Sequence, residues 1–161
     1  MASSTSKKVT AIRFDREPVN GFVNQQTWLQ AEGIELLTAT GSLSVLPYTD
    51  LKAVCFVRDF ASGATWRPNR VFAVRPKSEG LWVRFRFRDR DTIQGLVPGN
   101  LLALEADGFT ITPPDAAPFA SRVYLPRASV VEAQVLGVIG GVARRAARPK
   151  TELEDQLKMF E

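Results

Sequence analysis

Two segments of the sequence share one order of features, and they decide the fold. They read TAIRFDREPVNGFV at residues 10–23 and VRFRFRDRDTIQGLV at residues 83–97. In each, alternating apolar and polar residues lead to a polar turn and then to a second apolar stretch that contains a glycine, Gly21 or Gly95. Strict alternation is typical of a half-buried β-strand, and a glycine inside a strand often marks a bend or bulge. The pattern therefore predicts a curled pair of strands that is encoded twice.

The two copies keep the same order beyond these segments. Each continues through a loop and a further strand to a Leu-Pro pair and a closing apolar stretch, which are Leu46-Pro47 with 51–57 and Leu125-Pro126 with 130–138. Repeated features at a fixed spacing are the signature of an internal repeat. We therefore predict a mainly β chain with an internal duplication. Because a unit of about 50 residues buries little apolar surface alone, the two units should pack on each other or on another chain.

This interpretation divides the chain into five parts. They are a disordered N-terminus at 1–8, a first barrel at 9–60, a connector at 61–80, a second barrel at 81–139, and a basic linker with a short C-terminal helix at 140–161. Within the connector, residues 70–74 have the composition of an additional strand. Thr151 and Glu154 have the spacing of a capping box, which predicts a helix over about 152–160.

Composition excludes several kinds of chemistry. The chain has no histidine, which excludes a histidine general base, a histidine-ligated metal and a Ser-His-Asp triad. A single cysteine, Cys55, can form neither an internal disulfide nor a zinc site, and its apolar neighbours predict a core residue. No paired carboxylates and no phosphate-binding glycine motif stand out. We therefore expect a protein that is not an enzyme and has no metal or cofactor.

Charge and hydropathy bear on partners and location. The net charge of +4 is a mild basic bias that is compatible with an anionic partner. The N-terminus lacks the apolar core of a signal peptide, and no apolar stretch is long enough to cross a bilayer. We expect a cytoplasmic protein that does not interact with membranes.

Each copy resembles an Sm-like (Hfq/LSm) small barrel of SH3 type, over residues 9–57 and 81–138. The resemblance lies in the order strand, turn, strand with internal glycine, loop, strand, short turn and closing strand. It implies two tandem Sm-like barrels and, because Sm-like units pair through their edge strands, a homo-oligomer. The segments KAVCFVRDF at 52–60 and DTIQGLVPGNLLAL at 91–104 also resemble an uncharacterised bacterial family that is common in acidobacteria.

Sm-like proteins typically bind RNA through two loops, and the chain departs from their pattern there. Where Hfq-like proteins carry a Lys-His pair, the two copies have Leu46-Pro47-Tyr48 and Leu125-Pro126-Arg127. RNA binding therefore does not follow from the fold resemblance alone, since function depends on the site.

Two features are candidate nucleic-acid-binding sites. Strand alternation places Trp82, Arg84, Arg86 and Arg88 on one face, where the arginines would follow the phosphates of RNA or single-stranded DNA and Trp82 would stack on a base. The alternative is a solvated outer face whose charges discourage edge aggregation. Trp28, in the first loop, would stack on a base or anchor a partner, or would instead fold back to cap its own barrel.

The C-terminal residues Gln156, Leu157, Met159 and Phe160 belong to the sequence QLKMF, which resembles the bacterial sliding-clamp-binding motif. This resemblance predicts docking of the C-terminal peptide on a protein partner such as a sliding clamp, and the alternative is a helix that packs on its own barrel. Taken together, the sequence predicts a non-enzymatic binding or adaptor module that forms oligomers and contacts nucleic acid. The alternative is a structural or protein-interaction scaffold.

Overall fold

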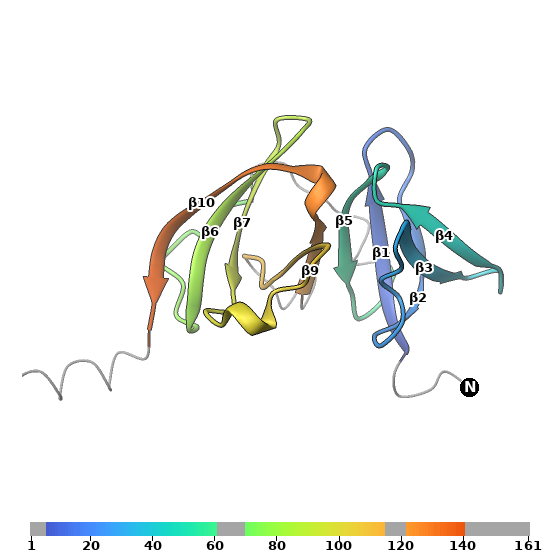
Figure 1. The fold of residues 1–161 in the computed structure, drawn as a ribbon, viewed down its shortest axis with the longest axis horizontal. Helices are drawn as coiled ribbons and strands as arrows, with labels where there is room; N and C mark the ends of the chain where they lie inside the picture. The colour runs from blue at the N-terminus through green and yellow to red at the C-terminus, as the bar shows by residue number, and fades with distance from the viewer. Residues whose placement is uncertain (1–5, 61–69, 115–121, 141–161) are drawn as a thin grey trace, which may run out of the picture.

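A computed structural model describes residues 6–60, 70–114 and 122–140. The described chain consists of strands and two short 3-10 turns (Figure 1), so the prediction of a mainly β fold is confirmed. In chain order the elements are β1 (Ser6–Arg13), β2 (Val19–Asn24), β3 (Gly33–Thr38), β4 (Leu43–Pro47), β5 (Leu51–Phe56), β6 (Gly80–Phe87), β7 (Thr92–Val97), η2 (Leu101–Ala103), β8 (Gly108–Ile111), β9 (Arg122–Pro126), η3 (Arg127–Ser129) and β10 (Val130–Ile139).

The strands form two antiparallel sheets, and the two halves of the chain use the same strand order. The first sheet has seven strands in the order β4-β3-β2-β1-β5-β9-β8, and the second has three in the order β10-β6-β7. The first half has the strand order β5-β1-β2-β3-β4. The second half has the corresponding order, β10-β6-β7 and then β8-β9, but its strands are divided between the two sheets. An isolated bridge between Leu96 and Thr112 links β7 to the residue that follows β8.

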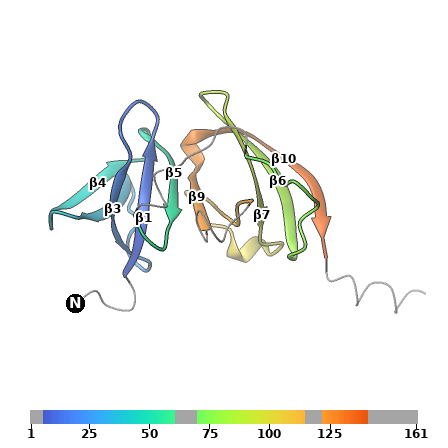
Figure 2. The same cartoon turned by 180° about the vertical axis from the view of Figure 1, so that it is seen from behind.

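The two halves are joined by an antiparallel pairing of β5 with β9, with Val54 opposite Tyr124 and Cys55 opposite Val123. Figures 1 and 2 show β5 and β9 facing each other between the halves. Because β1 occupies only one edge of β5, β9 provides hydrogen-bond partners for the other edge. The seven-stranded sheet therefore extends across the boundary that the sequence places between the two units.

Each half contributes side chains to the core of the other. The first core is made of first-half residues and Tyr124 of β9. The second is made of second-half residues together with Ile12, Ala53, Cys55 and Val57. Alternate residues of β5 point to opposite faces, so Val54 enters the first core and Cys55 the second, and the whole strand is buried. This sharing is what units too small to bury a core alone require.

The repeated glycines allow close approach of the neighbouring strands. A Cβ atom at Gly21 would lie 2.5 Å from the carbonyl oxygen of Leu37, and one at Gly95 would lie 2.5 Å from the side chain of Ile111. Such distances are shorter than real Cβ contacts. The interior glycine of each copy is therefore explained by packing between strands.

Several sequence-based boundaries are corrected or not covered. Strand β1 begins at Ser6, inside the N-terminus predicted to be disordered, because Lys7 and Lys8 pair with β2. Of the additional strand expected at 70–74, only a single bridge from Arg70 to Ile93 forms. The predicted C-terminal helix at 152–160 lies outside the described residues. Within the described ranges, no helix has the length and apolar character that crossing a membrane requires.

The buried hydroxyl of Tyr124 gives a first prediction. Its oxygen has no hydrogen-bond partner among the described residues, and burial raises its pKa well above the ordinary value. Since an unsatisfied buried polar group is costly, we expect Tyr124→Phe to leave the free energy of unfolding unchanged or to raise it by about 1 kcal/mol, as measured by urea denaturation. In the control Tyr48→Phe, a bond of 2.6 Å to the Gln30 carbonyl is lost, and stability should fall by about 1 kcal/mol. A loss for Tyr124→Phe as large as for Tyr48→Phe would contradict this prediction.

Candidate functional site

Two of the predicted ladder arginines lie side by side on the outer face of β6. Arg84 donates a hydrogen bond to Gln134, and Arg86 forms an ion pair of 2.9 Å with Glu132. Both partners lie on β10, directly opposite the arginines in the strand register. The side chains of Arg86 and Glu132 are about half exposed. The guanidinium groups are thus near solvent but already tied to the adjacent strand.

Trp82 lies on the same face and is covered by the segment that precedes β6. Its indole nitrogen donates to the Gln94 side-chain oxygen at 3.1 Å, and that oxygen also accepts from the Phe72 backbone. The Phe72 ring meets the indole edge-on, with 6.3 Å between the centroids. Trp82 therefore packs against protein groups and is only partly open to a base.

Arg88 does not continue the ladder. Strand β6 ends at Phe87, and Arg88 reaches from the following turn toward the first half of the chain. There it donates to the Thr49 carbonyl, and its guanidinium lies 4.0 Å from the centroid of the Phe14 ring. The alternation in the sequence continues through Arg88, but the strand does not, and Arg88 contributes to the contact between the two halves.

Trp28 is a core residue. Its side chain is only 5 % exposed. The ring packs edge-on against Phe56 and Tyr124, with centroid distances of 5.5 and 5.0 Å. Trp28 therefore folds back onto its own half, which was the alternative to an exposed loop platform, and its faces are not available to stack on a base.

Lys52 forms a cluster between the halves that the sequence analysis did not identify. Its ammonium group, on β5, lies 2.8 Å from one carboxylate oxygen each of Asp89 and Asp91 in the turn between β6 and β7. It also lies 5.1 Å from the centroid of the Phe87 ring. The side chain is nearly buried. The only signal in the sequence is a single charge inside the apolar stretch LKAVCFV, and nothing there names its partners.

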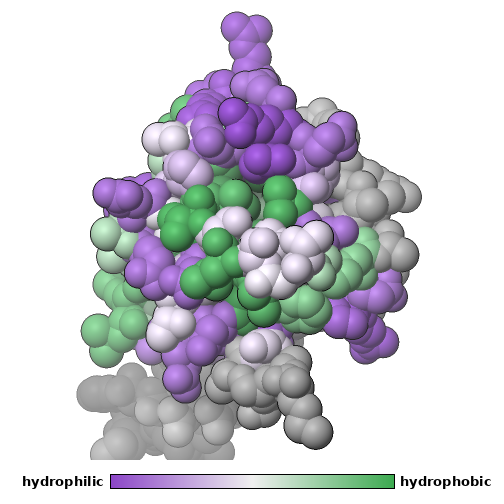
Figure 3. Space-filling view, turned by 90° about the vertical axis from the view of Figure 1, so that its right-hand side faces the viewer, coloured by the Kyte–Doolittle hydropathy of each residue, from purple (hydrophilic) through white to green (hydrophobic). Residues whose placement is uncertain are grey.

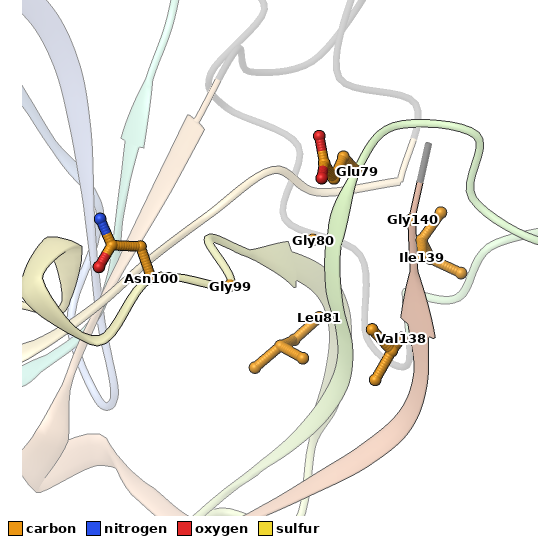
Figure 4. Close-up of a pocket in the computed structure, with 8 residues that line it drawn as sticks. All are labelled: Glu79, Gly80, Leu81, Gly99, Asn100, Val138, Ile139 and Gly140. Atoms are coloured by element: carbon orange, nitrogen blue, oxygen red, sulfur yellow. The ribbon is translucent and has the colours of Figure 1, made fainter. Parts of the chain in front are cut away.

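A hollow in the described part of the chain offers little chemistry. It has a volume of about 490 Å³ and lies between the start of β6, the end of β10 and the loop after β7 (Figure 4). Glu79 is its only ionisable lining residue, beside the amide of Asn100 and apolar or backbone groups. Cys55 is remote from solvent, and burial raises its pKa to about 12. Among the described residues, no three histidine, cysteine, aspartate or glutamate side chains cluster as metal ligands would.

The surfaces that remain are the two uncovered strand edges, on β4 and β10. Each is a terminal strand of its sheet, with a neighbour on one side only, whereas the other two terminal strands, β7 and β8, meet through the Leu96–Thr112 bridge. On β4, Leu43 and Val45 are 64 % and 51 % exposed, and Leu37 of β3 extends the apolar surface. Figure 3 shows apolar side chains gathered on this face of the molecule. On β10, the exposed apolar residues are Val131, Val135 and Val138.

The C-terminal candidates Gln156, Leu157, Met159 and Phe160 lie outside the described residues, and their docking on a partner stays a prediction. No curated protein and no solved structure matches the chain. A family model described as a family of unknown function (DUF6982) matches residues 5–137. The match spans both halves and the joint between them, so the chain belongs to this family.

Proposed function

We propose that the protein is a non-enzymatic binding or adaptor module, built of two Sm-like small barrels, that assembles into homo-oligomers through its edge strands. The observation that carries the proposal is the pair of uncovered strands, β4 and β10, with apolar side chains about half exposed on both. Unpaired strand edges with apolar side chains are templates for pairing with another chain. Soluble proteins also rarely leave such surfaces uncovered without a role in interaction.

The Sm-like part of the proposal is supported by the strand order. In both halves the closing strand, β5 or β10, lies beside the first strand, β1 or β6. The second, third and fourth strands of the half then follow in order. In the second half, the second and third strands, β7 and β8, are joined only by a bridge. The interior glycine of the second strand packs against the third strand in both halves. In this order the fourth and fifth strands are the edges of each half. The edges β5 and β9 pair with each other within the chain, and the edges β4 and β10 are left for pairing with another unit.

The non-enzymatic part is supported by the chemistry of the described residues. The hollow between the start of β6 and the end of β10 has a single carboxylate, Glu79, and no second acid or base to work with it. The one thiol is buried and protonated at neutral pH. General acid–base or nucleophilic catalysis needs such groups within hydrogen-bond reach of each other.

Solution mass tests the proposal. We expect light scattering or sedimentation to give a mass that is a multiple of 17.8 kDa at micromolar concentration and falls on dilution. A mass of one chain at every concentration, up to the solubility limit, would exclude assembly through the edges. The measurement should be made at two salt concentrations, because charged side chains flank β10.

Nucleic-acid binding by the basic face is the second candidate, and its supporting observation is that Arg84 and Arg86 share one solvent-exposed face. Because both arginines already have partners on β10 and Arg88 binds the first half, we expect little contribution to binding. The variant with Arg84, Arg86 and Arg88 changed to Ala should alter the affinity for single-stranded RNA or DNA at low salt by less than about threefold relative to the wild type.

The matched control for this titration removes the same charge elsewhere, by changing the exposed residues Arg16, Arg58 and Arg127 to Ala. If the first variant loses affinity by more than tenfold and the control does not, the basic face is a nucleic-acid site. In that case the slope of affinity against salt should also decrease, since each phosphate contact releases counterions.

A further inference from the structure

The joint between β5 and β9 provides a template for a second joint. On one face of this strand pair Val54 lies opposite Tyr124, and on the other face Cys55 lies opposite Val123. Tyr124 projects out of the second half and completes the first core, while Cys55 projects out of the first half into the second core. The pairing therefore buries both strands by inserting side chains of each half into the other.

Strand β10 corresponds to β5 position by position. Both begin four residues after the proline of a Leu-Pro pair, and both pair with the first strand of their half. Both also bulge at the second residue, because Lys52 in β5 and Val131 in β10 are skipped in the register. The shared bulge aligns the two strands without ambiguity, so Val54 corresponds to Ala133 and Phe56 to Val135.

Strand β4 corresponds to β9 in the same way. The Leu-Pro pairs align the strands, so Tyr124 corresponds to Val45 and Val123 to Ser44. Tyr124 is fully buried, but Val45 is 51 % exposed. Likewise Val135 lies opposite the buried Val83 on the core side of its sheet and is still 55 % exposed. The two strands that lack a partner are thus the counterparts of the two strands that form the internal joint.

We infer that β10 of one chain pairs antiparallel with β4 of a second copy of this chain, with Ala133 opposite Val45, Gln134 opposite Ser44 and Val135 opposite Leu43. This inference rests on the proposed function and deepens it, because it names the partner, the two strands and the register. The occupant is a second copy because each chain carries both halves of the joint, at opposite ends of its strand ladder. Such a head-to-tail contact builds a ring if it closes and a filament if it does not.

The second joint is more polar than the first. At the first joint, three apolar residues of the first half enter the core of the second half: Ile12, Ala53 and Cys55. Their counterparts at the second joint are polar: Arg86, Glu132 and Gln134. In the paired state these polar groups would face the inner side of β4, where Ser44 and Leu46 lie. The inserted apolar area is therefore smaller, and the contact between chains is weaker than the joint within the chain and sensitive to salt.

Cysteine cross-linking tests the register. One chain carries Ser44→Cys and another carries Gln134→Cys, and the native Cys55 does not interfere because it is buried. Directly opposite residues of antiparallel strands have Cα atoms about 4.5–5.5 Å apart, which is within the range that a disulfide spans. We expect mild oxidation to give a covalent dimer in the mixture and none with either chain alone. Replacing the second chain by one with Glu17→Cys, an exposed position in the turn between β1 and β2 of the other half, should abolish the product.

Charge insertion tests the same contact independently of cysteine chemistry. Val45→Asp and Val135→Asp should each weaken self-association by at least about tenfold, because a carboxylate would enter an apolar contact. Both side chains are half exposed in the single chain, so the thermal unfolding midpoint of the monomer should not change. The control Leu102→Asp, at a residue that is 94 % exposed on η2, should leave association unaffected.

The outcomes separate the inference from the proposed function. If the protein assembles but neither the cross-link nor the effect of Val45→Asp is found, the named joint is wrong and assembly uses another surface. If the protein is a single chain at every concentration and no cross-link forms, the inference and the proposed assembly both fail. A dimer that forms from Ser44→Cys chains alone would show a symmetric contact of β4 with β4, which also overturns the inference.

Discussion

Trp28→Ala is expected to lower the free energy of unfolding by about 3–5 kcal/mol, as measured by urea denaturation followed by circular dichroism. The indole is 5 % exposed and fills the first core between Phe56 and Tyr124. Truncation removes that apolar surface and leaves a cavity that the surrounding strands can only partly close. Because Tyr124 belongs to β9, the loss should also loosen the contact between the halves.

Trp82→Ala is the matched control, since it removes the same side chain from a position that is only partly buried. That indole packs on Phe72 and donates one hydrogen bond to Gln94, so we expect a loss of about 1–2 kcal/mol. Trp28→Phe should recover part of the loss seen with alanine. If Trp28→Ala instead kept wild-type stability and lost affinity for a ligand, Trp28 would be an exposed platform and its place in the core would be wrong.

Most strands of this fold could be predicted from the sequence because their signals are local. Alternation and an interior glycine predicted strands within 10–23 and 83–97, where the structure has β2 from Val19 and β7 from Thr92. Each of these signals depends on residues within a few positions of each other. The N-terminal start of β1 was missed because Lys7 and Lys8 are polar, and their strand conformation comes from pairing with β2.

The joint between the halves could not be predicted in this way. An apolar stretch was evident at 51–57 and a further strand was expected before Leu125-Pro126, but neither pattern says that β5 pairs with β9 across about 70 positions of sequence. Lys52 is a second example in which the sequence does not identify a contact between distant residues. A charge in an apolar strand is compatible with an edge, with a snorkelling side chain or with a buried ion pair. Only the position of the turn that holds Asp89 and Asp91 distinguishes these alternatives.

For the candidate site, too, the sequence predicted local features but not the pairing of distant strands. The sequence correctly placed Arg84 and Arg86 on one face, because period-2 alternation fixes the side of a strand on which residues lie. It could not show that β10 places Gln134 and Glu132 opposite them. It also indicated assembly through edge strands without naming which edges stay open. That identity follows from pairing, since β9 covers β5 and the Leu96–Thr112 bridge links the terminal strand β7 to the end of the terminal strand β8, which leaves β4 and β10 as the uncovered terminal strands.

Lys52→Met is expected to destabilise the protein by about 3–5 kcal/mol, because it removes one partner of a buried ion pair and leaves the others without compensation. The Lys52 ammonium binds Asp89 and Asp91 at 2.8 Å each, and the Asp91 side chain is only 8 % exposed. Methionine keeps most of the volume and the contact with the Phe87 ring, so the loss reports mainly on charge. Chemical denaturation at neutral pH measures it.

Two further variants separate charge from packing at this position. Arg86→Met breaks the ion pair with Glu132, whose members are about half exposed, and should cost less than about 1 kcal/mol. The triple variant Lys52→Met, Asp89→Asn, Asp91→Asn removes the stranded carboxylates and should recover much of the loss, because neutral groups are cheaper to bury than unpaired charges. If Lys52→Met costs no more than Arg86→Met, the lysine is hydrated in solution. The two halves would then be held by the β5·β9 pairing and the shared core alone.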